Sequence, residues 1–331
     1  MKVLFIRFSS IGDIVLTSPI VRCVKLQLNA EIHFVTKTSF VKTIADNPYI
    51  DKVWTIDQKV AEVASTLFEE QFDYVIDLHK NLRSRKFKKL AKIKYITFEK
   101  LNIEKWMLVN LKVNLLPKIH IVDRYFNALK QLGVIDDGQG LDYYIPESTQ
   151  LPNSLFNIDY IVIVVGAAHE TKAIKPEIII DIINHSDKNI VLLGGKSEIE
   201  KALTIKNSIA DRSRLFDFCG ATDLYGSAMI IKHAALVITP DTGMMHIAAA
   251  LQKKIISIWG STVPAFGMYP YYGEKSKMIA VIIENNQINC RPCSKIGFSK
   301  CPKGHFKCMS ELNVAEIQNK IRLLTTVQAN D

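Results

Sequence analysis

The sequence has 331 residues, of which 48% are hydrophobic and 23% charged, and its formal net charge is +9. This length predicts about two domains, and the apolar content excludes a disordered chain because burial can offset the entropy of ordering. The longest apolar run, residues 160–168, falls well short of the ~20 residues of a membrane-spanning helix, and residues 1–7 are too short for a signal peptide. We therefore expect a cytosolic protein whose positive charge favours acidic partners.

Apolar segments alternate with helical patterns in the first half of the chain. Strands are predicted over residues 3–8, 31–36, 52–56 and 74–78. Helical patterns occupy residues 19–28, 40–45, 60–68 and 82–91. The first of these starts at Pro19, whose missing N–H costs nothing in the first turn of a helix. Strand–helix alternation with apolar strands predicts a parallel sheet covered on both faces.

The same alternation restarts after residues 136–157, which are rich in turn formers and are predicted to be a linker. Strands are predicted over residues 160–165, 190–193, 235–238 and 255–259, and helices over residues 176–184, 199–209, 244–250 and 314–324. The sequence therefore predicts an α/β protein of two Rossmann-like domains, residues 1–150 and 158–331. Ligands of such domains bind at the carboxyl ends of the strands, in the cleft between the halves.

Two common nucleotide-binding signatures are absent from the sequence. Residues 9–13, Ser-Ser-Ile-Gly-Asp, contain one glycine and do not form a dinucleotide fingerprint. Residues 193–197, Leu-Gly-Gly-Lys-Ser, imitate the end of a P-loop, but Ile190 stands where its first glycine is required. Both absences argue against a dehydrogenase and a P-loop ATPase.

The turn after the first strand, residues 9–19, reads Ser-Ser-Ile-Gly-Asp-Ile-Val-Leu-Thr-Ser-Pro. Asp13 is therefore predicted at the ligand-binding edge of the first sheet. From spacing alone, its carboxylate can be either a helix cap or a general base.

A second turn, residues 237–246, reads Val-Ile-Thr-Pro-Asp-Thr-Gly-Met-Met-His. Here a helix is predicted to start just after a strand, and such a start can bind phosphate through its free N–H groups and its dipole. Thr242 can add a hydroxyl, and His246 lies about one turn inside the helix. The alternative is that Asp241 and Thr242 only cap the helix and that His246 is a core residue.

Basic residues are concentrated between Lys80 and Lys105, where the sequence contains ten basic and two acidic residues. This stretch is either a solvated helix face or a surface for a phosphate-rich acceptor or an anionic membrane.

Four of the six cysteines lie near the end of the sequence: Cys290, Cys293, Cys301 and Cys308. In a cytosolic chain, this pattern suggests a structural metal such as zinc, with spacing that fits a four-cysteine site loosely. Reduced thiols or a redox-formed bridge are the alternatives, and Cys23 and Cys219 are expected to be buried.

The two turns together resemble the bacterial ADP-heptose:lipopolysaccharide heptosyltransferase family, glycosyltransferase family 9. The resemblance rests on residues 9–14 with Pro19 and on residues 241–250, Asp-Thr-Gly-Met-Met-His-Ile-Ala-Ala-Ala. Residues 259–264, Trp-Gly-Ser-Thr-Val-Pro, and 266–271, Phe-Gly-Met-Tyr-Pro-Tyr, strengthen it, and it spans nearly the whole chain. It implies GT-B architecture, in which an N-terminal acceptor domain and a C-terminal donor domain present parallel sheets to a central cleft.

The resemblance also implies roles for individual residues. Asp13 matches the family's proposed catalytic base, and Lys172 matches a lysine that meets the donor phosphates during catalysis. Arg83 and Arg124 fall where anionic groups of the acceptor are expected. The implied donor-binding residues are Lys172, Glu198, Asp241, Thr242, Gly243 and His246.

The expected activity is the inverting transfer of a heptose or related sugar from an ADP-sugar to the lipopolysaccharide inner core, without a cofactor for catalysis. Asp13 would accept the proton of the attacking hydroxyl, while Lys172 and residues 242–243 would stabilise the departing diphosphate. The expected partners are the ADP-sugar, a lipid A or core oligosaccharide acceptor and an anionic membrane surface, but not nucleic acid. We expect a monomer at the cytoplasmic face of the inner membrane.

Two other functions are compatible with parts of the pattern. A sugar-nucleotide epimerase can share the two-domain architecture, but it releases free sugar and needs no acceptor. A nucleic-acid-binding protein could use the basic stretch, but few aromatic residues are interleaved there: Phe87, Tyr95 and Phe98.

Overall fold

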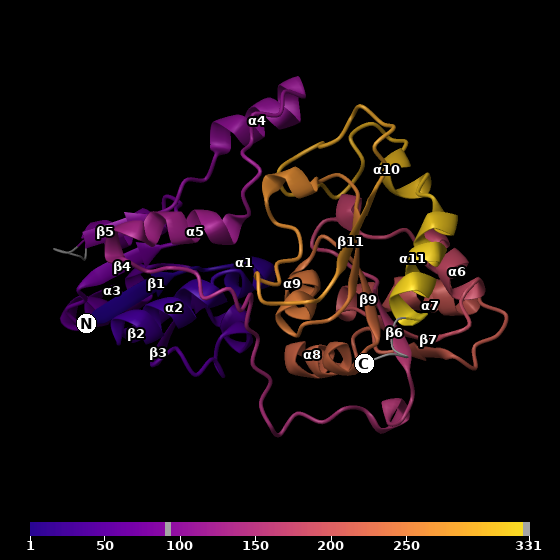
Figure 1. Cartoon of the computed structure of the whole chain (residues 1–331), viewed down its shortest axis with the longest axis horizontal. Helices are drawn as coiled ribbons and strands as arrows, with labels where there is room; N and C mark the ends of the chain where they lie inside the picture. The colour runs from indigo at the N-terminus through magenta and orange to yellow at the C-terminus, as the bar shows by residue number, and fades with distance from the viewer. Residues whose placement is uncertain (90–93, 327–331) are drawn as a thin grey trace. The chain divides into compact units, whose positions relative to one another are not determined.

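The computed structural model of the chain describes residues 1–89 and 94–326 and contains two compact units (Figure 1). Unit 1 consists of Met1–Leu101, Ile119–Pro146 and Tyr271–Ser276. Unit 2 consists of Asn102–Lys118, Glu147–Pro270 and Lys277–Asp331. Within the described part of the chain, none of the helices is both long enough and apolar enough to pass through a bilayer.

The sheet of unit 1 has five parallel strands in the order β3-β2-β1-β4-β5. The strands are β1 (Lys2–Ile6), β2 (Glu31–Lys37), β3 (Lys52–Ile56), β4 (Tyr74–Asp77) and β5 (Lys94–Thr97). The helical elements are α1 (Ile11–Val15), α2 (Ser18–Leu28), η1 (Thr38–Thr43), α3 (Ala61–Glu69), η2 (Ser84–Lys89), α5 (Ile121–Leu129) and η3 (Lys130–Leu132). This strand order is the Rossmann order, and the direction in which successive strands are added to the sheet reverses between β1 and β4.

The sheet of unit 2 has six parallel strands in the order β11-β10-β9-β6-β7-β8. The strands are β6 (Tyr160–Val164), β7 (Asn189–Leu193), β8 (Leu215–Asp217), β9 (Leu236–Pro240), β10 (Ile255–Trp259) and β11 (Ala280–Glu284). When the strands are counted from β6, this is again the Rossmann order, with its switch point between β6 and β9. The prediction of two Rossmann-like α/β folds is confirmed.

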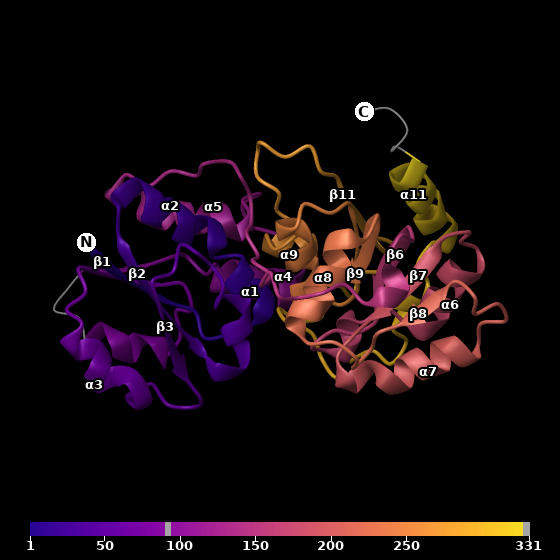
Figure 2. The same ribbon diagram turned by 90° about the horizontal axis from the view of Figure 1, so that it is seen from below.

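Helices α6 (Pro176–Asn184), α7 (Ile199–Asn207) and α11 (Val314–Thr326) share an apolar core with the central strands of unit 2. Helix α8 (Leu224–His233) packs against α9 (Gly243–Ala250), and α9 packs against β9 (Figure 2). The other helical elements of this unit are α4 (Asn102–Leu111), η4 (Asn153–Leu155), η5 (Glu170–Lys172), η6 (Lys196–Glu198), η7 (Pro264–Phe266) and α10 (Lys307–Ser310). An aliphatic core therefore stabilises unit 2, and the loops that follow the strands lie outside this core.

Most predicted strands and helices are confirmed to within a few residues, but two predicted helices are 3₁₀ turns. The pattern at residues 40–45 belongs to η1, and the pattern at residues 82–91 belongs to η2, with residues 90–91 outside the described part. The sequence pattern did not reveal α1, β5, α4, α5, β8, α8, β11 or α10. Of these, β8 has three residues, all only half buried, and therefore lacks an apolar signal.

The predicted linker, residues 136–157, is wrong in its first part, because residues up to Pro146 belong to unit 1. The cause is Arg22, a buried side chain of α2 that is 1% exposed. Its guanidinium donates to both carboxylate oxygens of Asp137 at 2.8 Å, to the carboxylate of Asp142, and to the carbonyl of Gly140 at 3.0 Å. Detaching residues 137–142 from α2 would leave the buried charge of Arg22 without a partner, which costs free energy. The ion pairs therefore hold this segment to unit 1.

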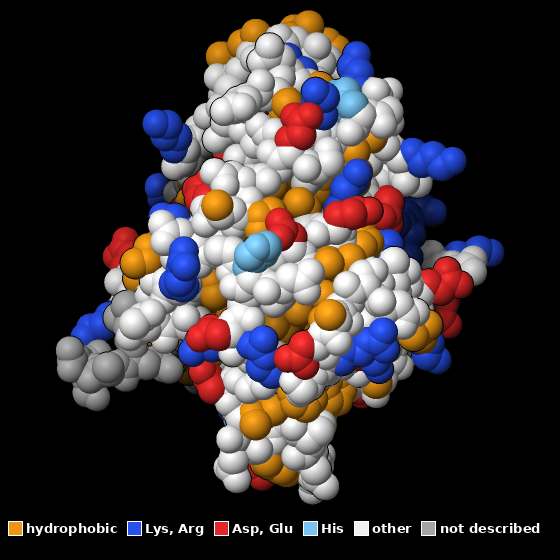
Figure 3. All heavy atoms as spheres, turned by 90° about the vertical axis from the view of Figure 1, so that its right-hand side faces the viewer, with side chains coloured by type: hydrophobic (Ala, Val, Ile, Leu, Met, Phe, Trp, Pro, Cys, Tyr) orange, Lys and Arg blue, Asp and Glu red, His pale blue; other side chains and the backbone are white. Residues whose placement is uncertain are grey.

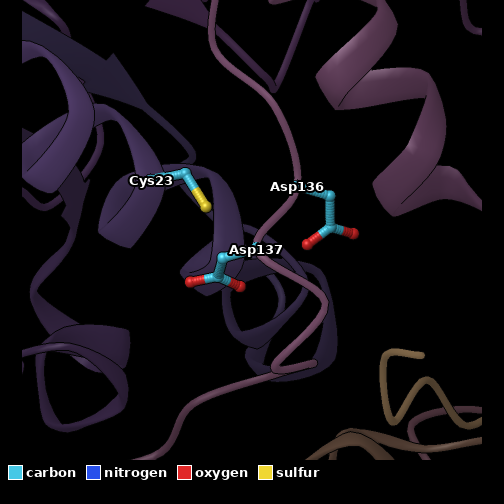
Figure 4. Close-up of side chains that lie close together, drawn as sticks. All are labelled: Cys23, Asp136 and Asp137. Carbon is cyan, nitrogen blue, oxygen red and sulfur yellow. The ribbon is translucent and has the colours of Figure 1, made fainter. Parts of the chain in front are cut away.

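Figure 4 shows the Cys23 thiol beside the carboxylates of Asp136 and Asp137. Arg22 pairs with Asp137, while the hydroxyl of Tyr271 donates to Asp136 at 2.7 Å. Burial raises the pKa of Cys23 to about 11, which keeps it a neutral thiol. These contacts make the cluster a structural one, and they fasten Tyr271–Ser276 to unit 1.

Candidate functional site

Asp13 lies in the first turn of α1, in the loop that follows β1. Its carboxylate accepts hydrogen bonds from the backbone N–H and the hydroxyl of Ser10, at 3.2 and 2.8 Å. It also forms an ion pair with Arg7, whose Nη2 lies 2.5 Å from Asp13 Oδ1. The capping contact predicted as one alternative is therefore present, and an ion pair that the sequence did not reveal accompanies it.

The electrostatics of Asp13 are set by two opposing effects. Burial alone would raise the pKa of Asp13, but the charge of Arg7 and the Ser10 hydrogen bonds outweigh it and lower the pKa to about 2. Arg7 is itself held in place, because its side chain donates to the carbonyls of Leu78 and Ser9. Asp13 is thus an ionised acceptor at neutral pH, with 22% of its side chain exposed.

Asp77, at the end of β4, organises the neighbouring loop. Its buried carboxylate accepts from the backbone N–H groups of His79 and Lys80, at 2.9 and 2.7 Å, and from the hydroxyl of Ser84 at 2.6 Å. This loop carries the exposed Arg83. Since β1 and β4 flank the switch point, the loop lies on the same sheet edge as Asp13.

Positive charge gathers at this edge. Burial lowers the pKa of His79 to about 3, and the charges of Arg7, Lys100 and Arg83 add to the effect, so the imidazole is neutral at pH 7. Burial and the charge of Arg7 also lower the pKa of Lys100. Arg83 therefore belongs to the same charged edge as Asp13.

Arg124 on α5 is buried, with 6% of its surface exposed, whereas Arg83 is open to solvent. Burial raises the pKa of the neighbouring Tyr125 to about 12, and the charges of Arg7, Asp13 and Arg124 all act on that phenol. Arg124 is therefore a buried cation near Tyr125, and it is not open to solvent as Arg83 is.

The basic stretch between Lys80 and Lys105 does not form a single helix face. Residues up to Leu101 belong to unit 1, and Lys105 on α4 belongs to unit 2, while Lys92 lies outside the described residues. Lys80 donates to the carbonyl of Phe98 at 2.7 Å, so part of the stretch has a structural role.

In unit 2, the loop after β9 leads into α9 as predicted. Thr242 occupies the N-cap position, and within the described residues its side chain makes no capping hydrogen bond to the first turn of α9. Gly243 begins the helix, and His246 lies one turn inside with 2% of its surface exposed. The first-turn N–H groups are therefore not capped by Thr242, which suits an anion-binding helix start.

Lys172 and Asp241 form the central contact of this edge. Lys172 Nζ lies 2.7 Å from Asp241 Oδ2, with 16% and 13% of the two side chains exposed. The hydroxyl of Thr262, in the loop after β10, donates to the same oxygen at 2.8 Å. Asp241 is therefore not a helix cap, and loops after three different strands converge on its carboxylate.

Glu198 lies at the loops that follow β6 and β7. The backbone N–H of Gly195 and the hydroxyl of Ser197 donate to its carboxylate, each at 2.8 Å. A side-chain carbon added at Gly166 would stand 2.3 Å from Glu198 Cδ, so the Glu198 carboxylate packs directly against the backbone at Gly166. Glu198 thus faces the same loop that carries Lys172.

Arg291 is a buried side chain that the sequence analysis missed, because its position within Cys290–Cys293 drew attention to the thiols. Its guanidinium donates to the carbonyls of Trp259, Gly260 and Thr262, at 3.2, 2.5 and 3.0 Å, and to Glu284 at 2.8 Å. It therefore fixes the loop that presents Thr262 to Asp241.

The rest of the cysteine-rich loop, residues 290–308, packs against the loop after β6 that carries Lys172. The backbone N–H of Phe298 donates to the hydroxyl of Thr171 at 2.8 Å, and the N–H of Thr171 donates back to the carbonyl of Phe298 at 3.1 Å. Gly297, with φ of +106°, packs so closely that an added side-chain carbon would lie 2.6 Å from His169 Cβ and 3.2 Å from Lys172 Cδ.

The predicted four-cysteine metal site finds no support in this loop. Within the described residues, no three of the sulfur atoms of Cys290, Cys293, Cys301 and Cys308 come within 4.8 Å of one another. The Cys293 thiol donates instead to the carbonyl of Cys290 at 3.4 Å, and burial raises the pKa of Cys308 to about 12. Backbone hydrogen bonds and Arg291 hold the loop.

Two Rossmann-like units with charged loops at their switch points define the GT-B architecture. More particularly, the model of glycosyltransferase family 9 (heptosyltransferase) matches residues 60–298, and the chain belongs to this family of glycosyltransferases.

Relatives and solved structures agree with this assignment. Lipooligosaccharide heptosyltransferase 2 of Campylobacter jejuni is 26% identical over 147 residues, which span 44% of each chain and so less than half of that relative. Lipopolysaccharide heptosyltransferase 1 of Campylobacter coli is 23% identical over 292 residues, 79% of this chain and 84% of that protein. The Escherichia coli heptosyltransferase WaaC with ADP matches the fold with a TM-score of 0.68 and 20% identity, over 99% of this chain and 100% of that one.

The Arg7→Met variant should raise the pKa of Asp13 from about 2, because burial is then opposed by the Ser10 hydrogen bonds alone. A carboxyl-carbon NMR titration measures this change. In the unsubstituted protein, Asp13 stabilises the fold fully above about pH 4, and this contribution of about 2 kcal/mol is lost as the pH falls through about 2.

The Arg7→Lys variant, which keeps a cation, should hold the pKa of Asp13 low, and Arg85→Met is the control for an exposed arginine. An Asp13 pKa near 2 in Arg7→Met would contradict the assigned cause.

The Gly297→Ala variant should reduce the free energy of unfolding of unit 2 by about 2 kcal/mol or more, because it adds a steric clash to an unfavourable φ. Gly304→Ala is the matched control, since Gly304 has φ of +74° and nothing within 4 Å of the added carbon. Its loss should stay near 1 kcal/mol. Equal losses in urea unfolding would show that Gly297 does not pack against the Lys172 loop.

Proposed function

We propose that this chain transfers a heptose or a related sugar from an ADP-sugar to an acceptor of the lipopolysaccharide inner core. The observation that carries the proposal is the Lys172–Asp241 pair beside the start of α9. A relative of the same fold was solved with ADP, and curated relatives are named as heptosyltransferases, which supports the choice of donor.

The donor diphosphate would bind at the N-terminus of α9. The first-turn N–H groups at Gly243 and the charge of Lys172 point to a place where negative charge is stabilised. As the glycosidic bond breaks, its electron pair goes to the diphosphate oxygen, so these groups would act where charge develops. Glu198 would contact the nucleoside, and Thr242 would add a hydroxyl donor.

The acceptor hydroxyl would attack the anomeric carbon on the face opposite the leaving diphosphate, which inverts the configuration. Its oxygen forms the new bond while its proton passes to the Asp13 carboxylate. A carboxylate with a pKa of about 2 is a weak base, so this transfer would occur late, when the attacking oxygen is already positively charged and acidic. No metal or other cofactor takes part in this step.

Arg83 and Arg124 would meet anionic groups of the acceptor, lipid A or core oligosaccharide, at the cytoplasmic face of the inner membrane. The charge of Arg83 contributes to the lowered pKa of His79, which lies in the loop beside Asp13.

The Asp13→Asn variant should reduce turnover about 10³-fold with an unchanged Kd for ADP, because the substitution removes the proton acceptor in unit 1 and leaves unit 2 intact. Asp57→Asn, at an exposed aspartate, is the control. Steady-state kinetics and calorimetry measure the two effects. Near-normal turnover would remove Asp13 from its role, and sugar release without any acceptor would favour an epimerase.

The Lys172→Met variant should lower kcat/KM for the ADP-sugar about 10²-fold or more, because the developing diphosphate charge loses its cation. The matched control is Lys175→Met, which changes a lysine three residues along whose ammonium lies 5.2 Å from the centre of the Phe306 ring. Unchanged kinetics of the Lys172 variant would rule out the proposed donor site.

A further inference from the structure

Large apolar side chains are exposed on two neighbouring segments of unit 2. Helix α4 buries Leu108, but it and the segment after it expose Ile103 (72%), Trp106 (51%) and further side chains. The α4 surface, as we define it, consists of Ile103, Trp106, Leu111, Val113, Leu115, Ile296 and Phe298. Seven of the twenty exposed large apolar side chains among the described residues thus lie on two short segments.

Hydrogen bonds at both ends of α4 hold these two segments side by side. Lys112, just after α4, donates to the carbonyls of Cys290 and Pro292, at 3.0 and 2.8 Å. Lys295 donates to the carbonyl of Asn102, the first residue of α4, at 3.1 Å. The loop that carries Ile296 and Phe298 therefore runs along the helix.

The charges on these segments are almost all positive. Residues 102–118 and 294–303 contain six lysines, and the one acidic side chain is Glu104. On the face shown in Figure 3, by contrast, acidic and basic side chains are interspersed. An exposed apolar cluster bordered by lysines is complementary to an anionic, amphiphilic partner.

We infer that the α4 surface docks on an anionic lipid bilayer. Ile103 and Trp106 enter the boundary between headgroups and acyl chains. Lys112 and Lys295 hold the two segments together, and the other lysines of these segments attract lipid phosphates. Tryptophan favours this depth, where its ring is apolar and its N–H meets water. Ten helical residues extend about 15 Å, so α4 lies in the interface and does not cross the bilayer.

Binding to sucrose-loaded vesicles tests this inference without any sugar nucleotide, so its outcome is separate from that of the proposed function. The protein should sediment with vesicles containing phosphatidylglycerol, and added salt or pure phosphatidylcholine should weaken binding about tenfold. The double variant Ile103→Ser/Trp106→Ser should weaken it about tenfold or more. Leu203→Ser/Leu323→Ser, at exposed leucines of α7 and α11, should bind as the unsubstituted protein does.

The fluorescence of Trp106 gives a second readout that does not depend on the affinity. Trp259 is buried, and Trp54 is half buried on β3 of unit 1, whereas the α4 surface belongs to unit 2. Quenching by spin-labelled lipid should therefore come mainly from Trp106, and this part should disappear in Trp106→Phe. Absence of quenching, or unaltered binding of the double variant, would overturn the inference. Dimers that shield Trp106 in the absence of vesicles would also overturn it, since the occupant would then be a second copy.

Discussion

Parallel strands end at the same edge of a sheet, and the candidate site depends on this constraint in both units. At the switch point of each Rossmann sheet, neighbouring loops diverge and leave room for a ligand. In unit 1, Asp13 follows β1 and the Asp77 loop follows β4. In unit 2, Lys172 follows β6 and Asp241 follows β9. Each unit therefore presents an ion pair beside its switch point, Arg7–Asp13 in unit 1 and Lys172–Asp241 in unit 2.

The two ion pairs at these edges have different surroundings. Arg7 is anchored to backbone carbonyls, so it stays beside Asp13 and keeps that carboxylate ionised despite burial. Asp241 is instead shared between Lys172 and Thr262, which come from different loops. Asp241 therefore holds the ammonium of Lys172 at a fixed place in the loop. There the ammonium would stay within reach of an incoming anion.

The cysteine-rich loop, residues 290–308, connects the surroundings of the Lys172–Asp241 pair with the α4 surface. Arg291 and Phe298 bind the loops that carry Thr262 and Lys172, while Lys112 and Lys295 tie the same loop to α4. Three of these contacts are hydrogen bonds to backbone carbonyls, and the fourth goes to the hydroxyl of Thr171. A surface that meets a membrane and a site that binds a nucleotide would thus share one supporting element.

The sequence by itself determined the two alternating α/β halves, the loops at their strand ends, and Asp13 and Asp241 as candidate residues. These features are local, because periodicity and turn residues act within a few positions of the chain. Only the tertiary structure decided that Arg7 controls Asp13, that Lys172 meets Asp241 and that Arg291 supports the loop that carries Thr262. It also decided that α4 joins unit 2 and that Tyr271–Ser276 joins unit 1. Each of these depends on side chains and carbonyls that lie far apart along the chain and meet only when the sheets form.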